Sequence, residues 1–144
     1  MKKTFVILLL SFGAVFGANA DTTVFDCTVK DGTHVTLQRA DNKDLWTTTI
    51  TEPNGSVKEI EKSGNDMATG FSYHAAASSA NTEIYVNTKN KMYVLGYNDQ
   101  GTSGDGYIQT MQNGKQTAYG ECDVKSFKVD FSKPELFENF TSVD

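Results

Sequence analysis

The sequence predicts an all-β protein: a small antiparallel β-barrel of about eight strands, with one disulfide and a short C-terminal helix or extension. Short runs of β-branched and aromatic residues recur at intervals of roughly 8–12 residues, each bounded by a turn signal. No convincing helical periodicity occurs before the C-terminus. Cys27 and Cys122 stand near the first and last of these runs, which suits the closure of a barrel.

Residues 1–20 have the pattern of a secretory signal peptide. Lys2-Lys3 forms the positive start, residues 4–17 are an apolar run, and Ala18-Asn19-Ala20 is a small-x-small cleavage site. Asp21 follows instead of a cysteine, so we expect no lipid anchor. No later run reaches the roughly 20 apolar residues of a membrane helix. We therefore expect a soluble periplasmic or secreted protein of a Gram-negative bacterium.

The charge balance of the chain is acidic. Lys and Arg number 13 and Asp and Glu number 18, which gives a formal charge of −5. Cleavage after residue 20 removes two lysines and no acid, so the charge becomes −7. Such a chain without a basic cluster is not expected to bind nucleic acid or an anionic membrane. A basic protein partner is favoured instead, through electrostatic steering and complementarity.

The two cysteines predict one disulfide. In an oxidising compartment Cys27 and Cys122 are expected to pair. Closing a loop of roughly 95 residues stabilises a fold by at most about 4–5 kcal/mol in the chain-entropy model. The alternative, a redox or metal-binding thiol pair, normally has its cysteines close in sequence, as in C-x-x-C.

The expected strands follow from alternation and turn signals. In order they are residues 22–29, 35–38, 45–51, 56–62, 67–74, 83–87, 91–97, 107–111 and 116–122, with a further strand at 124–129. Asp31-Gly32 and Pro53-Asn54-Gly55 predict turns. Asn113-Gly114 is the clearest signal for a type I′ hairpin. The small-residue stretch 75–81 and the Gly-rich segment 98–106 are expected to be loops.

The C-terminus differs from the rest of the chain, so we divide the chain into a signal peptide (1–20), a barrel domain (21–131) and an extension (132–144). Ser132-Lys133-Pro134-Glu135 forms a capping box with proline in the first turn. The apolar residues of the extension, expected on one face of a short helix, are Leu136, Phe137 and Phe140.

Catalytic motifs are scarce. His34 and His74 belong to no recognisable triad. Glu59 and Glu61 share one face of an expected strand, where a solvated face is the simpler interpretation. The 98–106 segment offers oxygen ligands but lacks the EF-hand spacing. We therefore expect no enzyme, no cofactor and no metal.

A set of short motifs resembles a known family. Residues 68–73 (Ala-Thr-Gly-Phe-Ser-Tyr) are followed by residues 84–89 (Ile-Tyr-Val-Asn-Thr-Lys), between the opening Phe25-Asp26-Cys27 and the late Cys122. This order resembles the periplasmic or membrane-bound inhibitors of C-type lysozyme, which are small exported β-barrels. The resemblance covers roughly residues 25–122.

The resemblance implies a site for a lysozyme. Thr69 stands where the family has a serine, while Gly70, Tyr73 and Lys89 match its glycine, tyrosine and lysine. In the family the serine and lysine enter the lysozyme cleft and meet its two catalytic acids. Thr69 would then hydrogen-bond the proton-donating acid, and the Lys89 ammonium would pair with the ionised carboxylate. The other predicted partner-binding residues are Ser72 and Asn90, the latter in place of the family's glycine.

Two other functions remain open. One is an exported immunity-type or other non-catalytic binding protein, which would use different surfaces, such as the 98–106 segment and the tail. The other is a carrier that holds a small ligand in the mouth of the barrel.

Overall fold

The computed structural model is all-β, as predicted. The part of the chain that it describes comprises residues 21–41, 43–74, 79–101, 104–131 and 134–143, without the side chains of 72–74. These residues form eleven strands and no α-helix. The predicted signal peptide, residues 1–20, lies outside the described residues.

The first sheet has the strand order β10-β1-β2-β3-β4, with all neighbours antiparallel. Its strands are β1 (Thr22–Thr28), β2 (His34–Arg39), β3 (Leu45–Thr51), β4 (Val57–Ser63) and β10 (Lys128–Val129). Burial alternates along β3, so that Trp46, Thr48 and Ile50 point into the core. This period of two is what a sheet with one covered face requires.

The second sheet has the order β11-β5-β6-β7-β8-β9. Its strands are β5 (Ala68–His74), β6 (Ser79–Asn87), β7 (Met92–Asp99), β8 (Gly104–Gln112), β9 (Lys115–Glu121) and β11 (Thr141–Ser142). The predicted hairpin at Asn113-Gly114 is confirmed, because both residues have the positive φ of a type I′ turn, 53° and 73°. β11 pairs with β5 in parallel.

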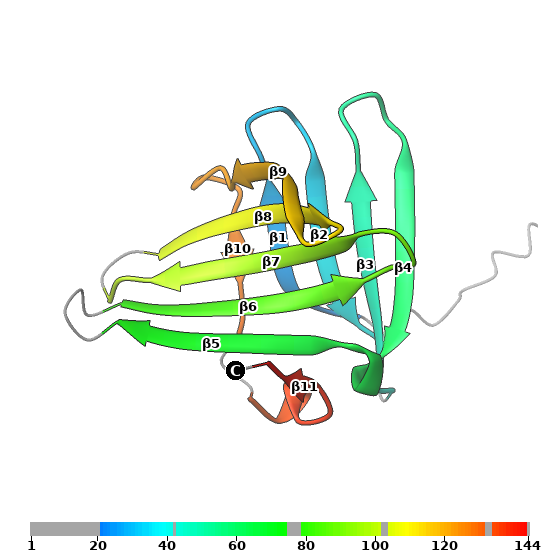
Figure 1. Ribbon diagram of the computed structural model, residues 1–144, viewed down its shortest axis with the longest axis vertical. Coiled ribbons are helices and arrows are strands. Elements are labelled where there is room, and N and C mark those ends of the chain that lie inside the picture. The colour runs from blue at the N-terminus through cyan, green and yellow to red at the C-terminus, as the bar shows by residue number, and fades with distance from the viewer. Residues whose placement is uncertain (1–20, 42, 75–78, 102–103, 132–133, 144) are drawn as a thin grey trace, which may run out of the picture.

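The two sheets pack face to face, and their strands run crosswise in Figure 1. The core lies between them. Its most deeply buried side chains include Phe25, Leu37, Trp46, Ile84 and Leu95.

The prediction of a closed barrel of about eight strands is wrong, because the strands divide into two open sheets. β4 does not pair with β5; a 3-10 turn, Gly64–Asp66, separates them. β4 is largely exposed and carries charges of both signs, from Lys58 and Glu59 to Glu61 and Lys62. Charged side chains along an edge strand oppose further pairing, which explains why the sheet stops there.

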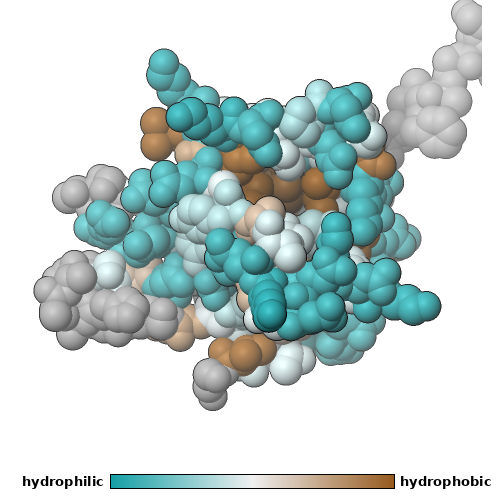
Figure 2. Space-filling view, turned by 45° about the horizontal axis from the view of Figure 1, so that its top comes forward, coloured by the Kyte–Doolittle hydropathy of each residue, from teal (hydrophilic) through white to brown (hydrophobic). Residues whose placement is uncertain are grey.

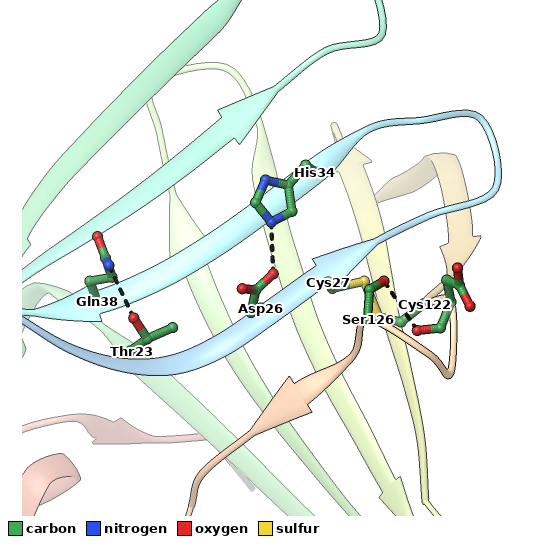
Figure 3. A network of polar contacts seen from close by, with 8 residues as sticks. Thr23, Asp26, Cys27, His34, Gln38, Cys122 and Ser126 are labelled. Carbon is green, nitrogen blue, oxygen red and sulfur yellow. Dashed lines mark hydrogen bonds and ion pairs between the residues drawn. A yellow bond between two sulfur atoms is a disulfide. The ribbon is translucent and has the colours of Figure 1, made fainter.

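The predicted disulfide is confirmed. Cys27 of β1 is bonded to Cys122, directly after β9, with Cα atoms 5.2 Å apart (Figure 3). An isolated β-bridge joins Val29 to Cys122 beside it. The disulfide therefore connects the two sheets.

The C-terminal tail covers one end of the space between the sheets, which we call the closed end. Phe137 stacks on Trp46 with ring centroids 5.3 Å apart, and Phe140 meets the same ring edge-on at 4.9 Å. Of the predicted short helix or extension, the structure has an extension with a single 3-10 turn, Pro134–Phe137, and no α-helix in its described residues. The Thr141 amide then donates to the Met67 carbonyl, which draws the chain into β11 instead of a longer helix. Ser132 and Lys133 of the predicted capping box lie outside the described residues.

The opposite end, which we call the open end, is not covered by the tail residues that the structure describes. There the β1–β2 turn, the β3–β4 turn and strands β7 to β9 surround a cleft of about 810 Å³. Figure 2 looks toward this end and shows hydrophobic surface recessed between hydrophilic rims.

Two expected loops are shorter than predicted. β6 already begins at Ser79, within the expected 75–81 loop, and β8 begins at Gly104, within the expected 98–106 loop. β7 pairs with both extensions, since Asp99 lies opposite Ala80 on one side and Gly104 on the other. Pairing on two sides stabilises a strand through residues of low β-propensity. Residues 75–78 and 102–103 lie outside the described part.

Candidate functional site

The predicted partner-binding residues lie on two separate parts of the second sheet. Thr69 and Gly70 belong to β5, and Lys89 and Asn90 lie in the turn between β6 and β7. Ser72 and Tyr73 are also on β5, opposite Asn81 and Ala80 of β6, but their side chains lie outside the described part.

Thr69 is built into the sheet. Its hydroxyl donates a 3.0 Å hydrogen bond to the Glu83 carbonyl of β6. On its other side, the Val143 amide donates to the Thr69 carbonyl over 2.9 Å. Thr69 is half-buried between two strands, so its hydroxyl has a structural partner within the sheet.

Gly70 is the point where an aromatic ring closely approaches the backbone. It lies diagonally across from Tyr85 of β6. A Cβ atom at Gly70 would lie 2.8 Å from the Tyr85 hydroxyl oxygen and 3.1 Å from its Cε2. A glycine in a strand interior commonly marks such a contact. The glycine is therefore explained by the ring that covers it.

Lys89 stands at the tip of a tightly bonded turn. The Thr88 amide donates to the Lys91 carbonyl over 2.7 Å. The Thr88 hydroxyl donates to the same carbonyl over 2.9 Å and accepts from the Lys91 amide at 3.1 Å. Lys89 and Asn90 lie between these anchors and are exposed. The turn thus presents an ammonium group on a fixed backbone.

The structure does not bring Thr69 and Lys89 together. Thr69 lies opposite Ile84 in the β5–β6 register, and Lys89 follows Ile84 by five residues. At the rise of a β-strand this places the two residues about 15 Å apart along the strand. The two carboxyl groups of a retaining glycosidase lie only about 5–5.5 Å apart. The backbone separation of Thr69 and Lys89 is therefore larger than the separation of the two acids.

A polar network that the sequence interpretation missed lies on the outer face of the second sheet. Glu83 of β6 accepts hydrogen bonds from the hydroxyls of Tyr85 and Tyr107. The Asn81 amide donates to the Tyr107 hydroxyl over 3.1 Å. Burial, then the hydrogen bond to Glu83 and its charge, raise the pKa of Tyr85 to about 12. Burial and the hydrogen bond to Glu83 also raise the pKa of Tyr107.

Further acids surround this network. Tyr107 stacks on Tyr119 with ring centroids 5.7 Å apart. Beside them lies a depression of about 370 Å³, whose lining includes Asp105 and Glu121. The alternation of Asn81, Glu83 and Tyr85 in the sequence was a usable signal for one polar face. The position of β8 beside this polar face depends on the strand register, which the sequence does not show.

The groups considered for catalysis whose side chains the structure describes lie on different strands and make no combined site, and the side chain of His74 lies outside the described part. His34 Nε2 lies 2.7 Å from Asp26 Oδ1 across β1 and β2 (Figure 3). Glu59 and Glu61 lie on the exposed strand β4. Within the described ranges, no group of three or more His, Cys, Asp or Glu residues is arranged to hold a metal ion.

Comparison with known proteins finds no matching family model, no matching curated protein and no matching solved structure. None of the helical segments in the described part is long and apolar enough to cross a membrane. The features that bear on function are thus the Lys89 turn, the acidic outer face and the cleft at the open end.

Proposed function

We propose that the chain is an exported, non-catalytic inhibitor of a lysozyme, with the C-type favoured, and that Lys89 enters the active-site cleft of the enzyme. The observation that carries the proposal is the turn itself. Lys89 is exposed at its tip, and three hydrogen bonds between Thr88 and Lys91 fix the backbone on both sides. A turn that is already ordered loses little conformational entropy on binding.

The chemistry of lysine suits an acid-lined cleft. Lysozymes act through two carboxyl groups, one protonated and one ionised. An ammonium group carries donors only, so it pairs with the ionised carboxylate and offers no bond to cleave. In this proposal Lys89 makes the central contact. Thr69 lies about 15 Å from Lys89 along the strand, and it supports β6 through its hydrogen bond to the Glu83 carbonyl.

The acidic outer face supports a basic partner. Glu83, Asp105 and Glu121 lie on this face of the second sheet, and the chain from residue 21 onward has a formal charge of −7. Charges of one sign steer an oppositely charged protein during its approach. The association rate with a basic lysozyme should therefore fall as the salt concentration rises.

A periplasmic location is part of the proposal. The Cys27–Cys122 disulfide forms and persists in an oxidising compartment, and the pattern of residues 1–20 fits export. A lysozyme that penetrates the outer membrane would meet the inhibitor there, before it reaches the cell wall.

The proposal is tested by a cell-wall turbidity assay with the purified protein and lysozymes of the C, G and I types. We expect stoichiometric inhibition of the C-type enzyme. Inhibition of another type alone would keep the inhibitor function and remove the family-based site assignment. If no type is inhibited, lysozyme inhibition is wrong, and an immunity-type binding protein becomes the leading candidate.

The site is tested by Lys89→Ala. Loss of a charge-assisted contact in a desolvated cleft should weaken inhibition by at least about tenfold. Lys115→Ala is the matched control, because Lys115 is also an exposed lysine beside a hairpin turn. Thr69→Ala should have a much smaller effect. Full inhibition by the Lys89 variant would exclude the turn as the contact.

A further inference from the structure

The cleft at the open end has the size and the lining of a ligand site. Its volume of about 810 Å³ lies within the range of small-molecule sites. Both sheets contribute to its wall: β2, β3 and the turns beside them from the first, and β7 to β9 from the second. Figure 2 shows the recessed hydrophobic surface from the open side.

The floor of the cleft is aliphatic. Val29, Val35, Ile50 and Ile108 line it, and each is 8% exposed or less in the absence of a ligand. None of the tail residues that the structure describes lines this floor, whereas Phe137 and Phe140 cover the closed end. A recessed aliphatic surface with one open side fits the hydrocarbon part of a ligand.

The rim of the cleft offers cations. Lys30 and Lys91 line it from opposite sheets, and Lys58 lies 5.5 Å from the ring centre of Tyr93, another lining residue. Among the residues that the structure describes, no carboxylate forms an ion pair with Lys30 or Lys91.

Two acids also reach the rim. Asp31 is engaged within its own turn, where it accepts a 2.8 Å hydrogen bond from the Thr33 amide, and this bond lowers its pKa. Glu52 is the other carboxylate of the lining. Lys30 and Lys91 of the lining, with Lys58 beside it over the Tyr93 ring, outnumber these two acids, and Asp31 points its carboxylate into its own turn. This arrangement favours an anionic head group over a cationic one.

We propose that the cleft binds an amphipathic molecule with a single acyl chain and an anionic head group. The acyl chain lies on the floor formed by Val35, Ile50 and Ile108. The head group lies at the rim between Lys30 and Lys91. This site is separate from the Lys89 contact, so each proposal stands or falls by its own experiment.

The proposal is tested by isothermal titration calorimetry of the purified protein with four probes below their micelle concentrations. These probes are palmitate, lysophosphatidylglycerol, hexadecanol and hexadecyltrimethylammonium. We expect both anionic probes to bind at least about tenfold more tightly than the neutral and cationic ones, through charge-assisted contacts with the lysines. The tighter of the two anionic probes identifies a free fatty acid or a lysophospholipid as the source.

Ala118→Trp fills the cleft from β9. Ala118 lines the cleft and is exposed, so the larger side chain fills it with little change in the melting temperature, about 3 °C at most. Palmitate affinity should fall at least about tenfold. Gln116→Trp is the control, because Gln116 is on the same strand but bonds to Gln109 away from the cleft.

Three results would overturn the proposal. They are the absence of binding by any anionic probe, equal binding by hexadecanol, and unchanged palmitate affinity in the Ala118→Trp variant. Tighter binding of the cationic probe would equally contradict the assignment of the rim lysines. A failure of the lysozyme-inhibition test does not bear on acyl-chain binding, because inhibition is assigned to Lys89 and not to the cleft.

Discussion

The closed end and the open end of the space between the sheets are stabilised in different ways. At the closed end, Trp46 is covered by Phe137 and Phe140 of the tail. At the open end, no aromatic side chain from the described part of the tail covers Ile50 and Ile108, and the Cys27–Cys122 bond lies close by instead. One end is thus held by packing, and the other is held by a covalent bond beside a cleft.

This difference shows how a small protein can remain stable with a cleft between its sheets. A cleft loses the dispersion contacts and the burial that a filled core provides. A disulfide stabilises without occupying the space, since it acts mainly by limiting the unfolded chain. The position of Cys122, bridged to the cleft residue Val29, is consistent with this division.

The largest expected effect comes from removal of the disulfide. Replacing Cys27 and Cys122 with alanine should lower the free energy of unfolding by as much as about 4–5 kcal/mol, because the closed loop is long. Urea denaturation of both proteins measures this change. Hydrogen exchange should quicken first at the open end, in β1 and β2. Faster exchange confined to the closed end would contradict our comparison.

The next effect is expected at the closed end. Phe140→Ala should cost about 3–4 kcal/mol, because it removes an enclosed ring from Trp46 and leaves a cavity. Ile108→Ala, in the open cleft, should cost only about 2 kcal/mol, since water or a ligand reaches the vacated space. Val124→Ala, at an exposed position, is the control. Equal losses at the two ends would show that the cleft is as tightly packed as the closed end.

The smallest effect on stability is expected on the outer face of the second sheet, which is part of neither the closed end nor the open end. The pKa of Tyr85 is raised to about 12, so the folded protein holds the proton more tightly than the unfolded chain does. The stability from this difference is complete below about pH 10 and is lost as the pH rises through about 12. In Tyr85→Phe the decline over this range should be smaller. Parallel stability curves for the two proteins, measured by urea denaturation, would show that Tyr85 is not responsible.

The local signals in the sequence were enough to predict most strands. Residues 45–51 are rich in threonine and include Trp46 and Ile50, and β3 has these bounds. The pairing of strand edges was not predictable, because it depends on contacts far apart in sequence. Closure of the strands into one barrel was therefore expected wrongly, and the parallel pairing of β11 with β5 was missed.

The candidate site was predictable only in part. The Lys89 turn follows from local residue types, and its exposure could be expected. The distance between Thr69 and Lys89 depends on the β5–β6 register, which a short motif does not specify. The cleft lies where residues of two sheets meet, namely Val29, Val35, Ile50 and Ile108. In the sequence, none of them differs from an ordinary core residue.

The tail also sets the order in which the molecule can be completed. Asn139 donates a hydrogen bond to Asp44 across 95 residues of chain. A chain that leaves a ribosome or an export channel N-terminus first makes this contact after all of β1 to β9 have emerged. Until then Trp46 lacks the two rings that cover it, Phe137 and Phe140. The closed end of the core is therefore completed by residues that are synthesised last.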